Sequence, residues 1–228
     1  MKHNPFRLLN KKDWALWLVS MLVVGASSFA AGNDGILSTA ASLVGVTALI
    51  FIAKGDVYGQ VLTIVFSLLY GIVSLKFKYY GEMITYLGMT APSAFVTLIA
   101  WLRHPYRDSN EVEVSHLNAK KALIVAVSSL AVTVIFYFIL GALHTPNLII
   151  STLSVFTSFS ACMLLIMRLP YYAVAYAAND IVLIILWVLA TIEDIQYLPM
   201  ILCFVMFFIN DLYGFYSWRK MKKRQGVD

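Results

Sequence analysis

Long apolar stretches separated by short polar breaks dominate the pattern of this chain. Each stretch is about 17 to 22 residues long, the length that an α-helix needs to cross a bilayer. The stretches cover residues 14–31, 37–53, 58–75, 83–102, 121–142, 147–167, 171–191 and 198–218. None shows the strict alternation of a barrel strand. The pattern therefore predicts an all-α polytopic membrane protein with about eight transmembrane helices, and Pro92 predicts a kink in the fourth.

A weak internal repeat runs through the chain. A gapless shift that carries Tyr70 onto Trp187 also carries Trp101 onto Trp218. It aligns the second, third and fourth stretches with the sixth, seventh and eighth. Equivalent helices lie four crossings apart, so the two halves point the same way across the membrane. This parallel repeat is one of the known designs of transporters.

The repeat predicts an organisation of two three-helix bundles and a linking helix. The amino-terminal stretch begins with basic residues and ends with small ones, as a signal peptide does, but its length favours a retained helix. We expect the following units: 1–36, the amino-terminal segment with an extra first helix; 37–102, the first bundle; 103–146, a loop and the linking helix; 147–218, the second bundle; and 219–228, a basic tail.

Composition and charge support a membrane location and suggest its orientation. The chain is 61% hydrophobic and 13% charged, against about 25% charged in soluble domains. Fifteen of its 17 Lys and Arg residues lie in the amino-terminal segment, the even-numbered loops and the tail, and the other two are Lys76 and Lys78. Basic residues gather on the cytoplasmic side, so both termini are predicted to be cytoplasmic. The net charge of +5 thus reflects topology and does not indicate nucleic-acid binding.

Motifs for metal binding, nucleotide binding and hydrolysis are absent from the sequence. All four histidines lie in tails or loops, and no HExxH or Cys/His spacing occurs, so we expect no metal and no cofactor. Cys162 and Cys203 lie within apolar stretches, as core residues do. The chain is therefore not expected to be an enzyme. A membrane-embedded enzyme that uses buried carboxylates as acid and base is the alternative from another class.

Polar residues interrupt the last apolar stretch in a helical pattern. Asn210, Tyr213 and Gly214 fall on one face of a helix, and Asp211 lies beside them. A polar or charged group at membrane depth is costly and usually faces a partner or a water-filled cavity. We therefore expect a site for a small polar, aromatic solute here. An interfacial aromatic belt is the alternative explanation for Trp218.

The seventh stretch carries a second Asn-Asp pair, Asn179 and Asp180, with Trp187 two turns further on. The two pairs could meet across one cavity, or they could form a clasp between the last two helices. An indole such as that of Trp187 can stack on a flat or positively charged ring. In the first bundle, Gln60 and Trp101 are weaker candidates for the same cavity.

The segments NDIVLIILW at 179–187 and INDLYGFYSWRK at 209–220 resemble the nicotinamide riboside transporters of the PnuC family. The resemblance covers about residues 37–220. It implies a fold similar to that of the SWEET sugar transporters, and uptake of nicotinamide riboside, a precursor of NAD, through the bacterial inner membrane. Transport would occur by facilitated diffusion with alternating access. Proton coupling through Asp180 is an alternative.

The resemblance also implies a site and partners. The pyridine ring would stack on Trp187, and Asn, Gln and Tyr side chains would bond the ribose. The candidate substrate-binding residues are Trp187, Asn179, Asp180, Asn210, Asp211, Tyr213, Gln60, Trp101 and Trp218. A cytoplasmic kinase would trap the riboside by phosphorylation, and further copies of the chain are candidate partners. The first bundle lacks the second Tyr-Gly-Trp-x-x-Trp element of better-known members, so thiamine or a deoxynucleoside is the alternative substrate.

Overall fold

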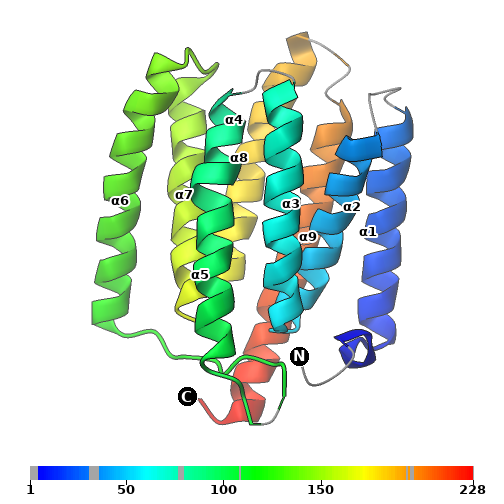
Figure 1. Cartoon of the computed structure of the whole chain (residues 1–228), viewed down its shortest axis with the longest axis vertical. Coiled ribbons are helices and arrows are strands. Elements are labelled where there is room, and N and C mark those ends of the chain that lie inside the picture. The colour runs from blue at the N-terminus through cyan, green and yellow to red at the C-terminus, as the bar shows by residue number, and fades with distance from the viewer. Residues whose placement is uncertain are drawn as a thin grey trace.

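The computed structural model of the chain describes residues 5–30, 36–76, 80–107, 109–193, 195 and 198–227. Helices dominate these residues and run side by side along one axis (Figure 1). A short 3-10 helix, Pro5–Leu8, precedes them. The others are α1 (Lys11–Ala30), α2 (Ile36–Ala53), α3 (Val57–Lys76), α4 (Tyr80–Thr85), the π-helix Tyr86–Thr90, α5 (Ala91–Leu102), α6 (Ala119–Ala142), α7 (Leu148–Ile166), α8 (Tyr172–Glu193) and α9 (Leu198–Gln225). The predicted all-α membrane fold is confirmed.

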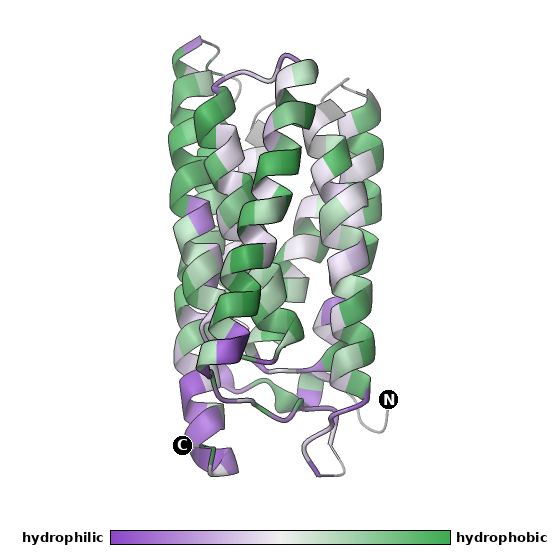
Figure 2. Ribbon diagram, turned by 90° about the vertical axis from the view of Figure 1, so that its left-hand side faces the viewer, coloured by the Kyte–Doolittle hydropathy of each residue, from purple (hydrophilic) through white to green (hydrophobic). Residues whose placement is uncertain are grey.

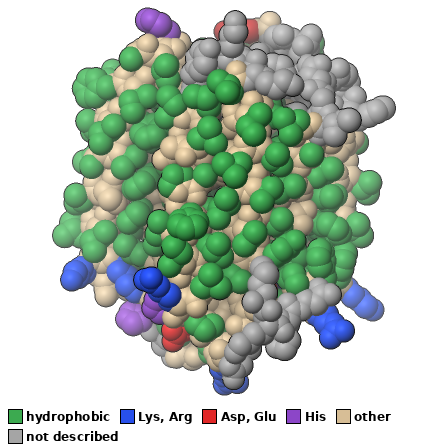
Figure 3. Space-filling view, in the orientation of Figure 1, with side chains coloured by type: hydrophobic (Ala, Val, Ile, Leu, Met, Phe, Trp, Pro, Cys, Tyr) green, Lys and Arg blue, Asp and Glu red, His purple; other side chains and the backbone are tan. Residues whose placement is uncertain are grey.

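The sides of the molecule are apolar and its two ends are not (Figure 2). Six helical segments of the described chain are long and apolar enough to cross a membrane, and α2 adds a shorter apolar helix, Thr39–Ala53. Lys and Arg side chains gather at the end that also carries both termini, which we call the basic face (Figures 1 and 3). The other end, which we call the opposite face, carries His144 and Glu193. Lys78, predicted there, lies outside the described residues.

Six helices form a closed ring. Going round it, α2 packs on α3, α3 on α5, α5 on α7, α7 on α8, α8 on α9, and α9 on α2. The third helix of each bundle therefore contacts the first helix of the other bundle, as expected for two parallel repeats. The linking helix α6 packs outside the ring on α7, and α1 packs outside it on α2 and α9.

The first helices of the two bundles, α2 and α7, end in the same way. Gly55 and Arg168 both adopt the left-handed conformation, with φ of +65° and +60°. Their amides donate to carbonyl oxygens in the preceding turns, Gly55 to Ile52 at 2.9 Å and Arg168 to Leu165 at 3.0 Å. These bonds satisfy carbonyl groups that a helix end leaves without a partner. The linking helix α6 and the last helix α9 end in the same way, at His144 and Gly226, so this geometry is shared by the repeat but is not specific to it.

A π-helix lies just before Pro92, where the sequence predicts a kink. The amide of Ala91 donates to the carbonyl of Tyr86, five residues earlier, so one turn of the helix is widened. Such turns occur mostly within longer helices and are frequent at functional sites. This one places Tyr86 and Thr90 in the wall of the central cavity described below.

Polar contacts hold α1 against the ring. Asp13 is fully buried and lies 2.9 Å from the ammonium group of Lys54. The hydroxyl of Tyr213 donates to the same carboxylate. One helical turn away along α9, the Asn210 amide donates to Ser20 at 2.9 Å. The face of α9 that carries Asn210 and Tyr213 therefore meets α1.

This arrangement predicts that Tyr213→Phe destabilises the protein. The substitution keeps the ring and removes the only hydroxyl donor to Asp13 among the described contacts, leaving a buried carboxylate oxygen unsatisfied. We expect a lower melting temperature in detergent, corresponding to about 1–3 kcal/mol. Tyr216→Phe, on the same helix at a 63% exposed position, is the matched control. Equal melting temperatures for both variants would contradict the assignment.

Asp56 caps α3 from a buried position. Its Oδ1 accepts a hydrogen bond from the Tyr58 amide at 2.8 Å, whereas its Oδ2 has no partner among the described residues. Burial raises the pKa of the Asp56 carboxyl above its ordinary value, and the bond from Tyr58 opposes this only in part. A raised pKa in the folded state means that folding favours the protonated carboxyl.

The stability that protonated Asp56 contributes is fully present below the ordinary aspartate pKa of about 4 and is lost as the pH rises through the raised value. Asp56→Asn keeps the capping oxygen and cannot ionise. We expect the variant to have a higher melting temperature than the native protein at neutral pH, and the same melting temperature near pH 4. Glu113→Gln, at an exposed carboxylate, is the control. A difference that does not change with pH would overturn this prediction.

Candidate functional site

A cavity of about 610 Å³ lies inside the six-helix ring. It runs from Tyr172, near the basic face, to the turn between α6 and α7, around His144 at the opposite face. All six ring helices contribute side chains to its wall. Its volume is in the range of pockets that hold small organic ligands.

Two tryptophans close the cavity beneath its floor. Trp101 and Trp218 are fully buried, with ring centroids 5.6 Å apart. The Trp101 indole donates to the Leu165 carbonyl at 3.2 Å, and the Trp218 indole donates to the Ile52 carbonyl at 2.8 Å. Each third helix is thus bonded to the end of the other bundle's first helix. Tyr172 lies on Trp218, 5.0 Å between centroids, and forms part of the floor.

The segment between α5 and α6 adds a second layer under the tryptophans. Val112 and Val114 are buried in the same apolar cluster. The Val112 amide donates to the Gly55 carbonyl, and the Ser115 amide donates to the Arg168 carbonyl, both at 2.9 Å. The linker is therefore bonded to the equivalent helix end of both bundles. The cavity is closed toward the basic face and reaches the opposite face.

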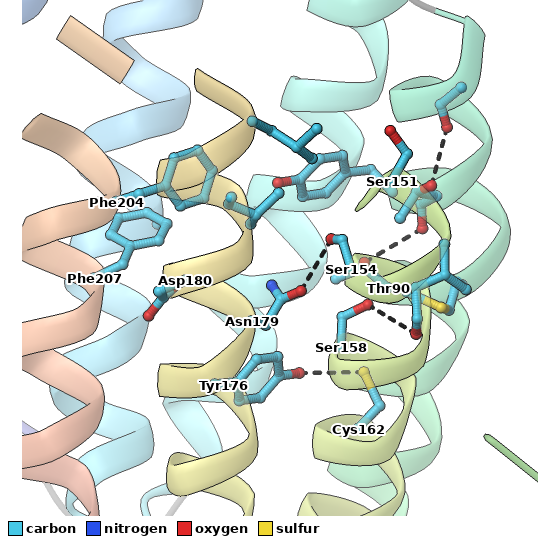
Figure 4. Close-up of a pocket in the computed structure, with 18 of the residues that line it drawn as sticks. Thr90, Ser151, Ser154, Ser158, Cys162, Tyr176, Asn179, Asp180, Phe204 and Phe207 are labelled. Carbon is cyan, nitrogen blue, oxygen red and sulfur yellow. Dashed lines mark hydrogen bonds between the residues drawn. The ribbon is translucent and has the colours of Figure 1, made fainter. Parts of the chain in front are cut away.

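The neighbouring residues Asn179 and Asp180 point to different neighbours. Figure 4 shows Asn179 directed from α8 toward α7, where its Oδ1 accepts hydrogen bonds from Ser154 and Thr157, each at 2.9 Å. Asp180 lies on the α9 side, near Phe204 (Figure 4). Both side chains line the cavity and are more than nine-tenths buried.

Asp180 meets the second acidic residue, Asp211, across the α8–α9 interface. Both carboxyl groups are buried, line the cavity and lie within hydrogen-bonding reach of each other. Two carboxylates at this distance repel unless a proton or a cation lies between them. Glu193 lines the mouth, and no Lys or Arg side chain lines the cavity within the described residues. The acidic pair therefore has room for a shared proton or for a positively charged ligand.

Gln60 lines the cavity from α3 and is fully buried. Neither its Oε1 nor its Nε2 has a hydrogen-bond partner in the described part of the chain. A buried amide without partners costs free energy, so such groups are rare unless something outside the protein satisfies them. A ligand in the cavity would supply both a donor and an acceptor to Gln60.

Aromatic rings form the wall beside the acidic pair. Trp187 and Phe204 lie nearly parallel, with planes 15° apart and centroids 6.5 Å apart. Phe207 and Tyr176 also line this part of the cavity. Flat faces of this kind stack on heteroaromatic rings and attract cations. No group of three or more metal-ligating side chains occurs among the described residues.

The structure thus separates the residues proposed from the sequence. Gln60, Asn179, Asp180, Trp187 and Asp211 line the cavity. The others lie outside it, two in contact with α1 and two in the layer beneath the floor: Asn210, Tyr213, Trp101 and Trp218. Trp218 is fully buried, so it does not belong to an aromatic belt at the membrane interface.

The candidate residues proposed on α9 from the sequence lie on two faces of the helix, and only the face of Asp211 lines the cavity. Phe204, Phe207 and Asp211 follow the spacing i, i+3 and i+7, which places them on one face, and this face lines the cavity. Asn210 and Tyr213 share the neighbouring face, which meets α1. The helical spacing of these two phenylalanines and the aspartate is the sequence signal that could have identified the cavity-lining face of α9.

Comparisons with known proteins agree with this geometry. A family model described as nicotinamide mononucleotide transporter matches residues 35–220. The nicotinamide riboside transporter PnuC of Neisseria mucosa is 28% identical over an alignment of 215 residues, and the match covers 92% of this chain and 82% of that protein. PnuC of Haemophilus influenzae is 22% identical and covers 92% and 90% of the two chains.

A crystal structure of the vitamin B3 transporter PnuC has the same architecture. It superposes with a TM-score of 0.79 at 27% identity, covering 95% of this chain and 94% of that one. The family model spans the whole ring and the linking helix. The chain therefore belongs to the PnuC family of multi-pass bacterial membrane transporters.

Proposed function

We propose that this protein takes up nicotinamide riboside through the bacterial inner membrane. The observation that carries the proposal is the buried acidic pair Asp180–Asp211 in a cavity whose described wall has no Lys or Arg. Nicotinamide riboside carries a fixed positive charge on its pyridinium ring, which these carboxyl groups would balance. The names of the relatives from Neisseria mucosa and Haemophilus influenzae support the same substrate.

The charge of the cavity favours the riboside over the mononucleotide. The mononucleotide adds a phosphate group, which proteins bind with Arg, Lys or helix N-termini. Asp180, Asp211 and Glu193 would instead repel it. Thiamine also carries a positive ring and stays the alternative cargo, whereas an uncharged deoxynucleoside would leave the acidic pair without a counter-charge.

In the proposed complex, the pyridinium ring stacks on Trp187 and Phe204 beside the acidic pair. Gln60, on the other bundle, bonds the ribose hydroxyls or the carboxamide with its two unpartnered atoms. Asn179, whose Oδ1 already accepts two bonds, donates its NH₂ group. Ligand binding would then join the first bundle to the second through one small molecule.

The transport cycle follows from the closed basic face. The basic face is cytoplasmic by the distribution of Lys and Arg, so the described state is closed to the cytoplasm. Alternating access would open the tryptophan and linker layers and close the opposite end. Transport is facilitated diffusion without chemical change, and phosphorylation by a cytoplasmic riboside kinase keeps uptake one-way. The protein acts as a single ring or as one unit of a homo-oligomer.

Gln60→Met tests the ligand contact. Methionine has a similar volume and removes both unpartnered polar atoms, so we expect an unchanged or higher melting temperature without ligand. Affinity for nicotinamide riboside should fall by on the order of tenfold, because at least two hydrogen bonds are lost. Calorimetry with the purified protein measures both the affinity and the heat of binding.

Ser74→Ala is the matched control for Gln60→Met. Ser74 lies on the same helix, is buried, and also lacks a partner among the described residues, but it lies outside the cavity. It should leave the affinity within about twofold, as should Tyr213→Phe. If Gln60→Met bound nicotinamide riboside with the affinity of the native protein, Gln60 would not be a ligand contact.

Asp180→Asn tests charge recognition. We expect it to weaken binding of nicotinamide riboside by about tenfold or more, because a cation in a partly desolvated site loses one counter-charge. The reduced dihydronicotinamide riboside has the same size and no ring charge, so its affinity should change little. Glu113→Gln, at an exposed carboxylate that does not line the cavity, serves as the control. An equal loss of affinity for both ligands would show that Asp180 supports the fold and does not recognise the charge of the ring.

A further inference from the structure

A second depression lies at the basic face, outside the ring cavity. Its volume is about 390 Å³, and it is bounded by the linker before α6, by the start of α8 and by the end of α9. Ser115 and Leu117 form one side, and Tyr171 and Phe215 form another. The transport site described above does not use any of these side chains.

Three cations line this depression from the last turns of α9. Arg219, Lys222 and Lys223 follow the spacing i, i+3 and i+4, so they share one helix face. No acidic residue of the described chain lines the depression, and no ion pair is formed by Lys222 or Lys223 within it. Like charges at this spacing repel one another. Within the described residues, Lys222 and Lys223 therefore have no counter-anion.

The acidic residues of the linker are already engaged. Glu111 pairs with Arg224, which does not line the depression, and Glu113 pairs with Arg168 at 3.4 Å. Lys121 is bonded to the linker itself, with its ammonium group 2.9 Å from the His116 carbonyl. These contacts hold the rim in place and leave the three cations of α9 facing the depression.

The inner wall is aromatic. The Arg219 guanidinium lies 5.7 Å from the centre of the Phe215 ring, and Phe215 lies 6.3 Å from Tyr171. A guanidinium held over a ring keeps its N–H groups directed sideways, where they can bond a phosphate in a bidentate manner. The cation nearest the membrane is thus positioned by packing.

The depression continues into a lipid-facing strip. Leu212 and Tyr216 share the α9 face of Arg219, by the spacing i, i+4 and i+7, and are 48% and 63% exposed. Tyr171 and Val174 at the start of α8 are 48% and 45% exposed. A ligand with an anionic head and apolar tails would match both the cations and this strip.

We propose that the depression binds the phosphate headgroup of an anionic phospholipid, with its acyl chains along Leu212 and Tyr216. Basic pockets between helices at the cytoplasmic boundary of a membrane bind such headgroups. A soluble phosphate ester would use the cations and leave the apolar strip without contact. The proposal does not depend on the identity of the transported solute.

The bound lipid would join the elements that close the cavity. The depression is built from the linker, α8 and α9, and the same linker is bonded to both bundles beneath the tryptophans. A headgroup held by Arg219 and Lys222 and packed against Ser115 would keep these elements together. Anionic lipid would therefore stabilise the state that is closed at the basic face.

The test compares two triple variants of the full chain in detergent. Arg219→Gln, Lys222→Gln and Lys223→Gln together remove the cluster. Lys11→Gln, Lys12→Gln and Lys120→Gln remove the same charge from exposed positions that are predicted to lie on the same side of the membrane and do not line the depression. The added probes are phosphatidylglycerol, phosphatidylcholine and glycerol 3-phosphate. Native mass spectrometry counts retained lipid, and thermal melting measures stabilisation.

We expect phosphatidylglycerol to raise the melting temperature of the native chain and of the control. In the depression variant its apparent affinity should fall by on the order of tenfold or more, since each Lys or Arg near an anionic headgroup contributes to binding. Phosphatidylcholine should have little effect on any of the three proteins. Equal losses in the two triple variants would overturn the proposal, and so would equal stabilisation by glycerol 3-phosphate.

Discussion

Within a bilayer, every buried polar group must find its partner inside the protein, and the closure of this ring follows from that constraint. Trp101 and Trp218 each carry one indole N–H into the interior. Each donates to a carbonyl at the end of the other bundle's first helix. The two bundles are thereby tied together by a reciprocal pair of hydrogen bonds, at the level where a solute path must be blocked.

The same constraint supports the proposed ligand site, because buried polar groups that line the cavity lack partners among the described residues. Gln60 is buried with two unpartnered atoms, and Asp180 and Asp211 lie together without a basic residue in the described wall. Asn179 also lines the cavity, but its Oδ1 is paired with two hydroxyls of α7. Gln60 is the one buried side chain of the described residues with two unpartnered polar atoms, and it lines the cavity, whereas Asp56, Ser74 and Asn210 each have one such atom and lie outside it.

At the basic face, the linker contacts both halves of the internal repeat and also borders the basic depression. Backbone amides of the linker donate to the carbonyl groups of Gly55 and Arg168, so one short segment is hydrogen-bonded to both halves of the repeat. The basic cluster of α9 borders the same linker and opens toward lipid. In the proposed cycle, transport and bound lipid would therefore act on one structural layer, the layer that closes the cavity toward the basic face.

Sequence alone determined the helices, their approximate ends, the internal repeat and the presence of buried carboxylates. These features are local, since apolar length and helical spacing are properties of one segment. Five of the nine candidate residues also line the cavity, among them Asp180 and Asp211, which the sequence marks because charged groups are unusual at membrane depth. Only the tertiary structure decided which neighbour each helix face meets. Asn210 and Tyr213 share a polar face as predicted, but that face contacts α1, because spacing along one helix carries no information about the helix packed against it.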